Sequence, residues 1–455
     1  MGAQGMRIAL SAANFCNEPL PVYPLGMGVI ARALTDAGHE VMQFDPMMYG
    51  IDGFAAEARR AVESFRPDAV GVSIRNIDVT DSRNANEEFF ASIRRVVECW
   101  RSLVDCPVVL GGAGFSMNPE AVLSATGADY GIAGEGEQAA KDLFGAIADG
   151  KAPPRGTVIR RKSAEILGSR YSRTIASWYD QETHNIPVQT KRGCPFGCVY
   201  CTYPSLEGRE IRSRDIEDVL GDIAFIKSNW PDSMVYFTDS VFNDPSRIWE
   251  ELLRKMVERG LSVPWTGFIT PCGLSDADIS LMAGSGLISA DLGVDGATDA
   301  TLEGLGKSFR FDDVRRCCRT LLGKGVTVNA NAMFGGPGET WDTVREGISN
   351  MRSLEPVFSI IFAGIRVLSG APLVNTARRE GAVPEGWNDT EPLYYYAPGI
   401  DAQRLDRELR EGFAGSEFCI YPPSSRSDDL RALHKFGFAR LHAMRLTSKR
   451  SRRKR

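Results

Sequence analysis

The feature that most constrains the fold is an alternation of short apolar runs with longer amphipathic stretches, which occurs twice along the 455-residue chain. Such an alternation is typical of parallel strands that are buried on both faces and separated by helices. The first series lies within residues 1–150 and predicts a doubly wound parallel α/β sheet, which binds ligands at the carboxyl ends of its strands. Its apolar runs predict strands over residues 7–12, 40–44, 68–74, 107–110 and 130–133.

A second series begins at residue 186 and ends near residue 369. Strand and helix patterns again alternate, and six such units suit a partial or full parallel barrel, whose chemistry lies on the loops that follow the strands. The predicted strands cover residues 188–192, 234–238, 265–269, 289–294, 326–333 and 358–367.

These patterns divide the chain into four segments. Residues 1–150 form the doubly wound domain and residues 186–369 the barrel. Residues 151–185 are polar, contain two prolines and are predicted to be a linker. Residues 370–455 have a weaker pattern and are predicted to be a C-terminal extension with a basic tail, which is either a solvated end or a contact for a polyanion.

Composition excludes several classes of protein. No apolar run reaches the 18 or so residues that a membrane-spanning helix needs, and the N-terminus lacks a secretory pattern, so we expect a cytoplasmic protein without membrane contact. The net charge of −5 is a poor match to nucleic-acid binding. The ten cysteines are unevenly placed, which favours metal or redox chemistry over disulfides.

The strongest motif is a cluster of three cysteines on the loop after the first barrel strand. Cys194, Cys198 and Cys201 have the spacing C-x3-C-x2-C. Cubane iron–sulfur clusters usually take four thiolates, so three would leave one iron free to bind a ligand. A structural zinc ion and three buried thiols are the alternatives, although none of the four histidines has zinc-like spacing.

The stretch Lys191-Arg192-Gly193-Cys194-Pro195-Phe196-Gly197-Cys198-Val199-Tyr200-Cys201 resembles the cysteine motif of the radical SAM superfamily. The resemblance covers roughly residues 187–367. It implies a [4Fe–4S] cluster on the three cysteines and S-adenosylmethionine (SAM) on the open iron. One electron, from a donor such as flavodoxin or ferredoxin, then yields a 5′-deoxyadenosyl radical that abstracts hydrogen from the substrate. Phe196 and Tyr200 are expected to contact the cofactor.

The resemblance also implies roles for residues after later strands. Thr238 and Asp239 follow the second strand, where the family binds the methionine amine. Asp295 follows the fourth strand, where a carboxylate can accept hydrogen bonds from the ribose or the substrate. Lys307 follows a helix-like turn and could also reach the active site. Asp239, Asp295 and Lys307 are the predicted catalytic residues. The alternative is a strand-end cap or loop residue for the two aspartates and a solvated lysine for Lys307.

Four further cofactor contacts are predicted near the fifth and sixth strands. The stretch from Asn329 to Thr340 resembles the glycine-rich turn at which the family contacts adenine, so Asn329, Gly335 and Gly336 are expected to touch SAM. Arg366 is predicted at the end of the sixth strand, where a guanidinium could pair with a carboxylate.

The first domain resembles a cobalamin-binding domain in three pieces: residues 71–75, residues 111–113 and residues 134–137. The resemblance implies that Ser73, Arg75, Gly111 and Gly112 line the corrin and its nucleotide tail. The family's Asp-x-His-x-x-Gly element is absent after the first strand, and the only histidine of the domain is His39. Histidine ligation of cobalt is therefore not expected, and the domain could also keep the fold without the cofactor.

Charged and polar residues crowd the segment after the third strand, and they could bind a polar substrate or pair with one another instead of facing an apolar macrocycle. They are Arg75, Asn76, Asp78, Asp81 and Arg83.

Three functions remain open at this point. The first is cobalamin-dependent methylation of a carbon in a small natural-product molecule. The second is a cobalamin-independent radical dehydration or deoxygenation of a sugar diol, as in aminoglycoside antibiotic biosynthesis, with a nicotinamide-dependent reductase as a partner. The third is a tRNA methylthiotransferase-like modification, against which the acidic charge and the lack of a basic RNA-binding domain argue.

Overall fold

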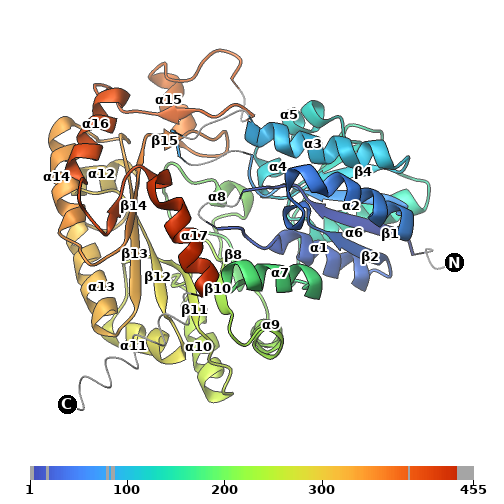
Figure 1. Ribbon diagram of the computed structural model, residues 1–455, viewed down its shortest axis with the longest axis horizontal. Coiled ribbons are helices and arrows are strands. Elements are labelled where there is room, and N and C mark those ends of the chain that lie inside the picture. The colour runs from blue at the N-terminus through green and yellow to red at the C-terminus, as the bar shows by residue number, and fades with distance from the viewer. Residues whose placement is uncertain (1–4, 17–19, 78–80, 84–87, 388–389, 438–455) are drawn as a thin grey trace.

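The computed structural model describes residues 5–16, 20–77, 81–83, 88–387 and 390–437, which form two α/β units side by side (Figure 1). The basic tail at residues 448–455 and Asp78 lie outside the described residues. Within the described part, every helix is too short or too polar to cross a membrane.

The N-terminal unit is a six-stranded parallel sheet with the order β2-β1-β3-β4-β5-β6. Its first five strands confirm the predicted fold class, with bounds within one residue of those expected. The strands are β1 Arg7–Ala12, β2 Glu40–Phe44, β3 Ala69–Ser73, β4 Val108–Gly111, β5 Tyr130–Gly134 and β6 Thr157–Arg161.

Helices cover both faces of this sheet, because its strands are apolar on both sides. Helices α1 (Leu25–Asp36) and α6 (Glu137–Ala148) pack on one face. The other face is covered by α2 (Gly50–Phe65), α3 (Glu88–Leu103) and α5 (Pro119–Thr126), with Trp100 and Phe54 among its buried side chains. The short elements η1 (Pro46–Met48) and α4 (Ala113–Met117) follow β2 and β4.

Residues 151–185 differ from the predicted linker. They contain β6, which pairs with β5, and α7 (Arg173–Thr183), which begins after the cap residue Ser172. The strand is hard to recognise in the sequence because it lies at the sheet edge, and Arg160 and Arg161 point to solvent there.

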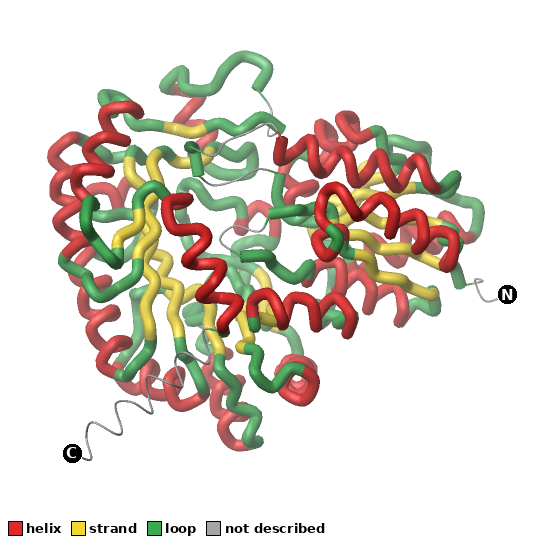
Figure 2. Tube along the Cα trace, viewed as in Figure 1, coloured by secondary structure: helices red, strands yellow, loops and turns green. Residues whose placement is uncertain are grey.

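The second unit is a partial barrel of parallel strands with helices outside (Figure 2). Five of the six predicted strands are present, and the sheet order is β17-β14-β13-β12-β11-β10-β7. The first, predicted over residues 188–192, lies earlier, because β7 ends at Val188. The bounds of the strands are β7 Asn185–Val188, β10 Met234–Phe237, β11 Trp265–Ile269, β12 Ser289–Asp295, β13 Thr327–Phe334, β14 Ser359–Ala363 and β17 Cys419–Ile420. The outer helices are α9 Ile216–Asn229, α10 Ile248–Glu258, α11 Asp276–Ser285, α12 Asp299–Gly304, α13 Phe311–Gly323 and α14 Trp341–Arg352.

The inner and outer faces of the barrel strands differ in burial. On β13, Val328, Ala330 and Ala332 are fully buried and belong to the hydrophobic core shared with the outer helices. The alternate residues, Asn329 and Asn331, keep accessible surface. Since side chains alternate between the faces of a strand, these polar residues line the inside of the barrel.

The C-terminal extension is part of the barrel rather than an appendix, because β17 pairs with β14. A two-residue strand is too short to predict from its sequence pattern. Strand β16 Tyr394–Tyr395 of the extension pairs with β15 Ile365–Arg366, which follows β14. The extension also contains α15 Leu373–Arg379, α16 Ala402–Gly412, η2 Pro423–Arg426 and α17 Ser427–Phe436. Helix α17 packs against α7, and Lys435 Nζ lies 2.8 Å from Glu182 (Figure 1).

Candidate active site

The cysteine loop starts from a short antiparallel ladder between β8 (Lys191–Arg192) and β9 (Arg212–Ser213) and leads into α8 (Tyr203–Leu206). Gly193 begins the loop with a φ of 98°, and a Cβ at this position would lie 2.0 Å from the Glu210 carbonyl oxygen. Only glycine fits a left-handed backbone in such close contact with another backbone segment.

The two basic residues before the cysteines anchor the loop in different directions. The Lys191 ammonium donates to the Phe242 carbonyl at 2.6 Å and lies 2.9 Å from Asp244, inside the barrel unit. The Arg192 guanidinium lies 2.7 Å from Glu137 at the start of α6. The loop is therefore held by both units.

The three cysteines share this loop, with Cys194 buried and Cys198 and Cys201 partly exposed. Burial raises the pKa of Cys194, and it raises that of Cys201 to about 12, with the neighbouring thiolates adding to both shifts. Such thiols stay protonated near neutral pH unless a metal displaces the proton. No three His, Cys, Asp or Glu side chains among the described residues close around a single ion. A cubane does not require that arrangement, because each of its cysteines binds a different iron.

Three predicted residues meet beside the cysteine loop. Lys307 Nζ lies 2.5 Å from Asp295 Oδ2 and donates to the Tyr200 hydroxyl at 3.0 Å, and that hydroxyl donates to Asp295 at 2.6 Å. Lys307 is 6% exposed; burial alone would lower its pKa, but Asp295 and Cys198 raise it. Asp295 ends β12 with a φ of 63°, a left-handed backbone that is uncommon outside glycine and often found at functional sites. The arrangement offers a carboxylate and an ammonium to a ligand next to the cysteines.

The catalytic role predicted for Asp239 needs correction. Asp239 is fully buried and accepts hydrogen bonds from Thr190 N at 2.7 Å, Thr190 Oγ1 at 2.6 Å and Lys191 N at 3.2 Å. Because the carboxylate is enclosed and accepts these three hydrogen bonds, it holds the base of the cysteine loop and cannot contact a ligand. Thr238 remains partly exposed on the inner face of the barrel.

The residues predicted to contact SAM near the fifth and sixth strands lie at different heights along the barrel axis. Asn329 lies inside β13, well below the strand end, and not on the glycine turn. A Cβ on Gly336 would meet Ile365 at 2.4 Å and one on Gly335 would meet Tyr396 at 3.1 Å, so protein side chains occupy the space beside these glycines. Arg366 lies in β15, beyond the end of β14.

Two residues of the loop's surroundings were not predicted. Ser240 Oγ donates to the Gly193 carbonyl at 2.9 Å and hydrogen-bonds to Cys194. Glu207 accepts from Gly193 N at 3.1 Å, and burial raises its pKa. Both lie near predicted residues in sequence, but nothing in their spacing distinguishes them from loop residues.

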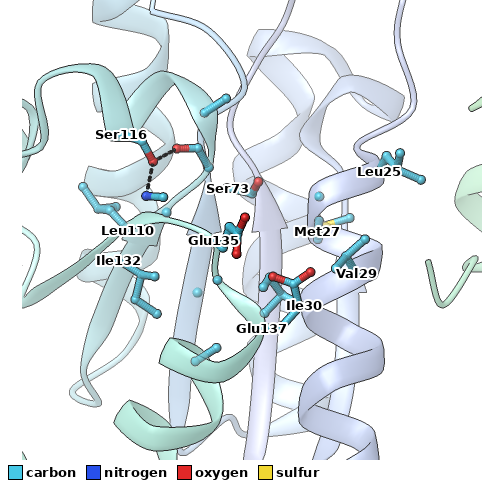
Figure 3. Close-up of a pocket in the computed structure, with 18 of the residues that line it drawn as sticks. Leu25, Met27, Val29, Ile30, Ser73, Leu110, Ser116, Ile132, Glu135 and Glu137 are labelled. Atoms are coloured by element: carbon cyan, nitrogen blue, oxygen red, sulfur yellow. Dashed lines mark hydrogen bonds between the residues drawn. The ribbon is translucent and has the colours of Figure 1, made fainter. Parts of the chain in front are cut away.

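A pocket of about 270 Å³ opens at the carboxyl ends of the N-terminal strands, as expected for a doubly wound sheet. In Figure 3, α1 supplies Met27, Val29 and Ile30 on one side, Leu110 and Ile132 lie opposite, and Glu135 and Glu137 lie between them. Most of the lining is apolar, and Glu135 and Glu137 supply carboxylates to it.

The structure places Ser73, Gly111 and Gly112 in the lining of this pocket, whereas Arg75 is exposed and outside it. Gly112 has a φ of 99°, and a Cβ there would meet the Ile74 carbonyl at 2.4 Å. Ser116 Oγ donates to the Gly112 carbonyl at 2.7 Å and accepts from Gly134 N at 2.8 Å (Figure 3). These bonds hold the glycine turn open to the pocket.

The barrel unit completes the pocket with residues of the cysteine loop and its neighbours: Gln189, Arg192, Tyr203, Leu206 and Glu207. The pocket and the cysteines are therefore built on adjoining segments.

His39 is far from this pocket along the sheet. It precedes β2, and its Nδ1 accepts from Met6 N at 3.1 Å, before the start of β1. Since the strands are parallel and the pocket lies at their carboxyl ends, His39 lies at the amino-terminal ends of the strands, on the far side of the sheet from the pocket. In the described part of the chain, no histidine lines the pocket.

Comparison with known families identifies both units. The family model of the radical SAM superfamily matches residues 188–349, and that of the B12 binding domain matches residues 18–144. The protein is a radical SAM enzyme with a B12-binding domain.

One curated relative and two solved structures resemble the chain over most of its length. Tryptophan 2-C-methyltransferase from Streptomyces laurentii is 24% identical over 429 residues, covering 76% of this chain and 71% of the relative. The radical SAM methyltransferase TsrM from Kitasatospora setae, solved with cobalamin and a [4Fe–4S] cluster, has a TM-score of 0.80 at 21% identity, covering 97% of this chain and 100% of that one. The cobalamin-dependent radical enzyme OxsB has a TM-score of 0.64 at 13% identity, covering 95% and 72%. The structural likenesses show a common fold.

The two domains imply a [4Fe–4S] cluster, SAM and cobalamin, and the residues present fit them. The radical SAM domain offers three thiols on a loop that glycine allows to fold tightly, with Lys307 and Asp295 beside it. The B12-binding domain offers an apolar pocket with a glycine turn at its mouth, which suits the nucleotide tail of cobalamin.

Proposed function

We propose that the enzyme methylates a carbon of a small molecule in a cobalamin-dependent reaction. The observation that carries the proposal is the pocket of the B12-binding domain, because residues of the cysteine-loop region complete its mouth. A tail bound there would bring the cobalamin ring to the space between the two domains, next to the predicted SAM site. The Streptomyces laurentii relative is named as a C-methyltransferase, and its reaction type enters here as part of the proposal.

Each bound group would supply chemistry that side chains cannot: the cluster passes one electron to SAM, SAM provides a radical or a methyl group, and cobalamin carries the methyl group. Cys194, Cys198 and Cys201 would hold the cluster. Asp295 would accept hydrogen bonds from hydroxyl groups of a ligand, and the contact with Lys307 holds that carboxylate in place.

The residues around the pocket would exclude water and fix the orientation of cobalamin. Leu110, Ile132 and Met27 offer an apolar surface, and Ser73 lies where β3 ends at the mouth. As a further part of the proposal, a flavodoxin or ferredoxin supplies the electron.

The alternative of radical dehydration loses one of its supports. The charged segment after β3 is the reason to expect a polar ligand there, but two of its charged members, Asp81 and Arg83, contact protein. Arg83 forms an ion pair with Asp406 of α16, and Asp81 accepts from Arg83 N at 3.0 Å. The Arg83–Asp406 pair joins the domains. The nicotinamide-dependent reductase belongs to this less supported alternative.

The test loads the enzyme with hydroxocobalamin under anaerobic conditions, removes free cobalamin by desalting, and records the corrin absorption. Ala140 of α6 is fully buried and lines the pocket, so Ala140→Phe should fill it and abolish retention. Ala148→Phe, at the exposed end of the same helix, is the matched control and should retain cobalamin. Iron content reports whether the radical SAM domain of each variant is intact.

The second measurement follows the methyl group. With SAM and reductant, wild type should form S-adenosylhomocysteine only when cobalamin is bound. Wild type that holds no corrin, or forms the same products without it, would overturn the proposal.

A further inference from the structure

One layer of the barrel interior contains an acidic residue that the proposed mechanism does not use. Asp291 of β12 is in register with Phe268 of β11 and with Asn329 of β13. Residues in register on neighbouring strands point to the same side of the sheet, so these three side chains face the inside of the barrel at one level. This level lies below Asp295, which ends β12.

Asp291 has a neutral partner but no cationic one. Its Oδ1 accepts from Asn329 Nδ2 at 2.7 Å, and that nitrogen is also 3.4 Å from Ser289 Oγ. In the described ranges no lysine, arginine or histidine forms an ion pair with Asp291, whereas Asp239, Asp244 and Asp295 each lie within 4.0 Å of a lysine. A carboxylate in such a place needs a counter-charge to remain ionised.

The surroundings of Asp291 are both desolvated and accessible. Burial raises its pKa, although the hydrogen bond from Asn329 opposes the shift, so water solvates this carboxyl poorly. Its side chain nevertheless keeps some accessible surface on the inner face of the barrel. A group that is removed from bulk water but can be reached from inside is suited to meet a small ligand.

Two aromatic rings stand beside this carboxyl. Phe268 is 38% exposed, which is unusual for phenylalanine on a strand between two others. Its ring packs against Tyr236 in an edge-to-face arrangement with centroids 5.7 Å apart. Tyr236 lies on β10, which is separated from β12 by β11. Burial, and to a smaller extent the charge of Asp291, raise the pKa of Tyr236. Aromatic faces attract cations, and a carboxylate attracts them more strongly.

We propose that Asp291 binds an ammonium group of the substrate, with Asn329, Phe268 and Tyr236 around it. The substrate class is a small amine with an apolar or aromatic body that packs on Phe268. This inference deepens the proposed function and rests on it in one respect, namely that the substrate enters the barrel. Asn329, predicted to contact SAM, is thereby assigned to the substrate.

The test compares two probes of equal shape on the anaerobically reconstituted holoenzyme: phenethylamine, which is cationic near neutral pH, and 2-phenylethanol, which is neutral. Wild type should bind phenethylamine tighter by roughly tenfold or more, the size of one ion pair with cation–π support. Asp291→Asn should abolish this preference. Asp312→Asn on α13, whose side chain is 86% exposed, is the matched control and should keep it.

Thermal unfolding separates a binding role from a structural one. A carboxyl without a counter-charge does not stabilise the empty enzyme, so Asp291→Asn should melt at the same or a higher temperature than wild type. A clear fall in the melting temperature would overturn the inference by making Asp291 a structural residue. So would equal affinity of wild type for the two probes, or an unchanged preference in Asp291→Asn.

These outcomes are distinct from those of the proposed function. If wild type prefers the amine but retains no corrin, cobalamin-dependent methylation is overturned and the amine site at Asp291 is supported. If wild type retains corrin but does not prefer the amine, the amine site is overturned and cobalamin-dependent methylation is supported.

Discussion

At the scale of single residues, some buried charged side chains have a partner of opposite charge and others have only neutral hydrogen-bond donors. Lys191 has Asp244 at 2.9 Å and Asp239 at 3.7 Å, which compensates for its removal from water. Asp45 at the end of β2 has only neutral hydrogen-bond donors, Met47 N at 3.0 Å and the Tyr179 hydroxyl at 2.9 Å. It is 1% exposed, and burial raises its pKa to about 6.

Asp45→Asn should therefore change the pH dependence of stability. The folded-state pKa of about 6 lies above the usual 3.8, so the unfolded chain releases its proton first as the pH rises. The folded state loses stability between about pH 4 and pH 6, by up to about 3 kcal/mol, and does not regain it above that range. Asparagine can keep the bond from Met47 N without the charge.

Urea unfolding at two pH values measures the effect. Relative to wild type, Asp45→Asn should be close to neutral near pH 4 and stabilising by about 1–3 kcal/mol at pH 7.5. Asp342→Asn, with a side chain that is 93% exposed, is the control. An Asp45→Asn variant less stable than wild type at both pH values would contradict the assignment.

The Lys307–Asp295 pair allows a second test at this scale. Lys307→Met leaves the Asp295 carboxylate without its cation in a partly buried site, which typically costs about 3–5 kcal/mol for a buried pair and less for one that water reaches. Adding Asp295→Asn removes the unpaired charge, so the double variant should be more stable than Lys307→Met alone. Thermal melts of wild type, the two single variants and the double variant give the coupling energy between Lys307 and Asp295. If the stability losses of the two single variants add up to the loss of the double variant, the two side chains are not coupled.

For individual elements, the cysteine loop shows how a short ladder places chemistry. The β8–β9 ladder is two residues long, and Gly193 follows it directly where Glu210 crosses closely. Gly197, inside the same loop, has an ordinary φ and open space where a Cβ would project. The loop conformation therefore requires glycine at position 193 but not at position 197.

Gly193→Ala should displace the loop and lower the iron content of the reconstituted protein several-fold, because the added methyl meets backbone and the backbone is left-handed. Gly197→Ala should keep the iron content of wild type. Cobalamin retention checks that the N-terminal domain of each variant is folded. Equal iron in both variants would show that the close approach of Glu210 does not constrain the loop.

Over the whole molecule, ion pairs join the two domains next to the pocket. Arg192 reaches Glu137, and Arg212 reaches Glu135, which also accepts from Ser163 N at 2.7 Å. Side chains of Arg192 and Glu137 are only 10% and 4% exposed. Since both glutamates also line the pocket, the same contacts fix the domain arrangement and the shape of the cofactor site.

Arg192→Glu should weaken docking and reduce cobalamin retention, because it places two carboxylates together in a buried contact at a cost of about 3–5 kcal/mol. The exchange Arg192→Glu with Glu137→Arg should recover part of the retention. Arg160→Glu, which breaks the exposed Arg160–Glu120 pair, should change stability by less than about 1 kcal/mol. Retention that is equal in wild type and Arg192→Glu would rule out the coupling.

The sequence alone predicted the α/β class, most strands of both sheets and the cysteine loop, because these depend on local periodicity and spacing. It could not reveal β6 or β17, since an edge strand with exposed arginines and a two-residue strand lack a periodic pattern. It also could not separate Asp239 from Asp295. Both follow barrel strands, but one turns into the protein and the other towards Lys307.

What the sequence determined by itself is therefore the order of elements and the presence of three thiols with the spacing of a cluster ligand set. Only the tertiary structure decided which polar side chains share a space: Tyr200 with Lys307, Glu137 with Arg192, and Asp291 with Asn329. The physical reason is that such contacts join residues far apart in the chain. Their geometry follows from strand register and domain packing, which no local pattern records.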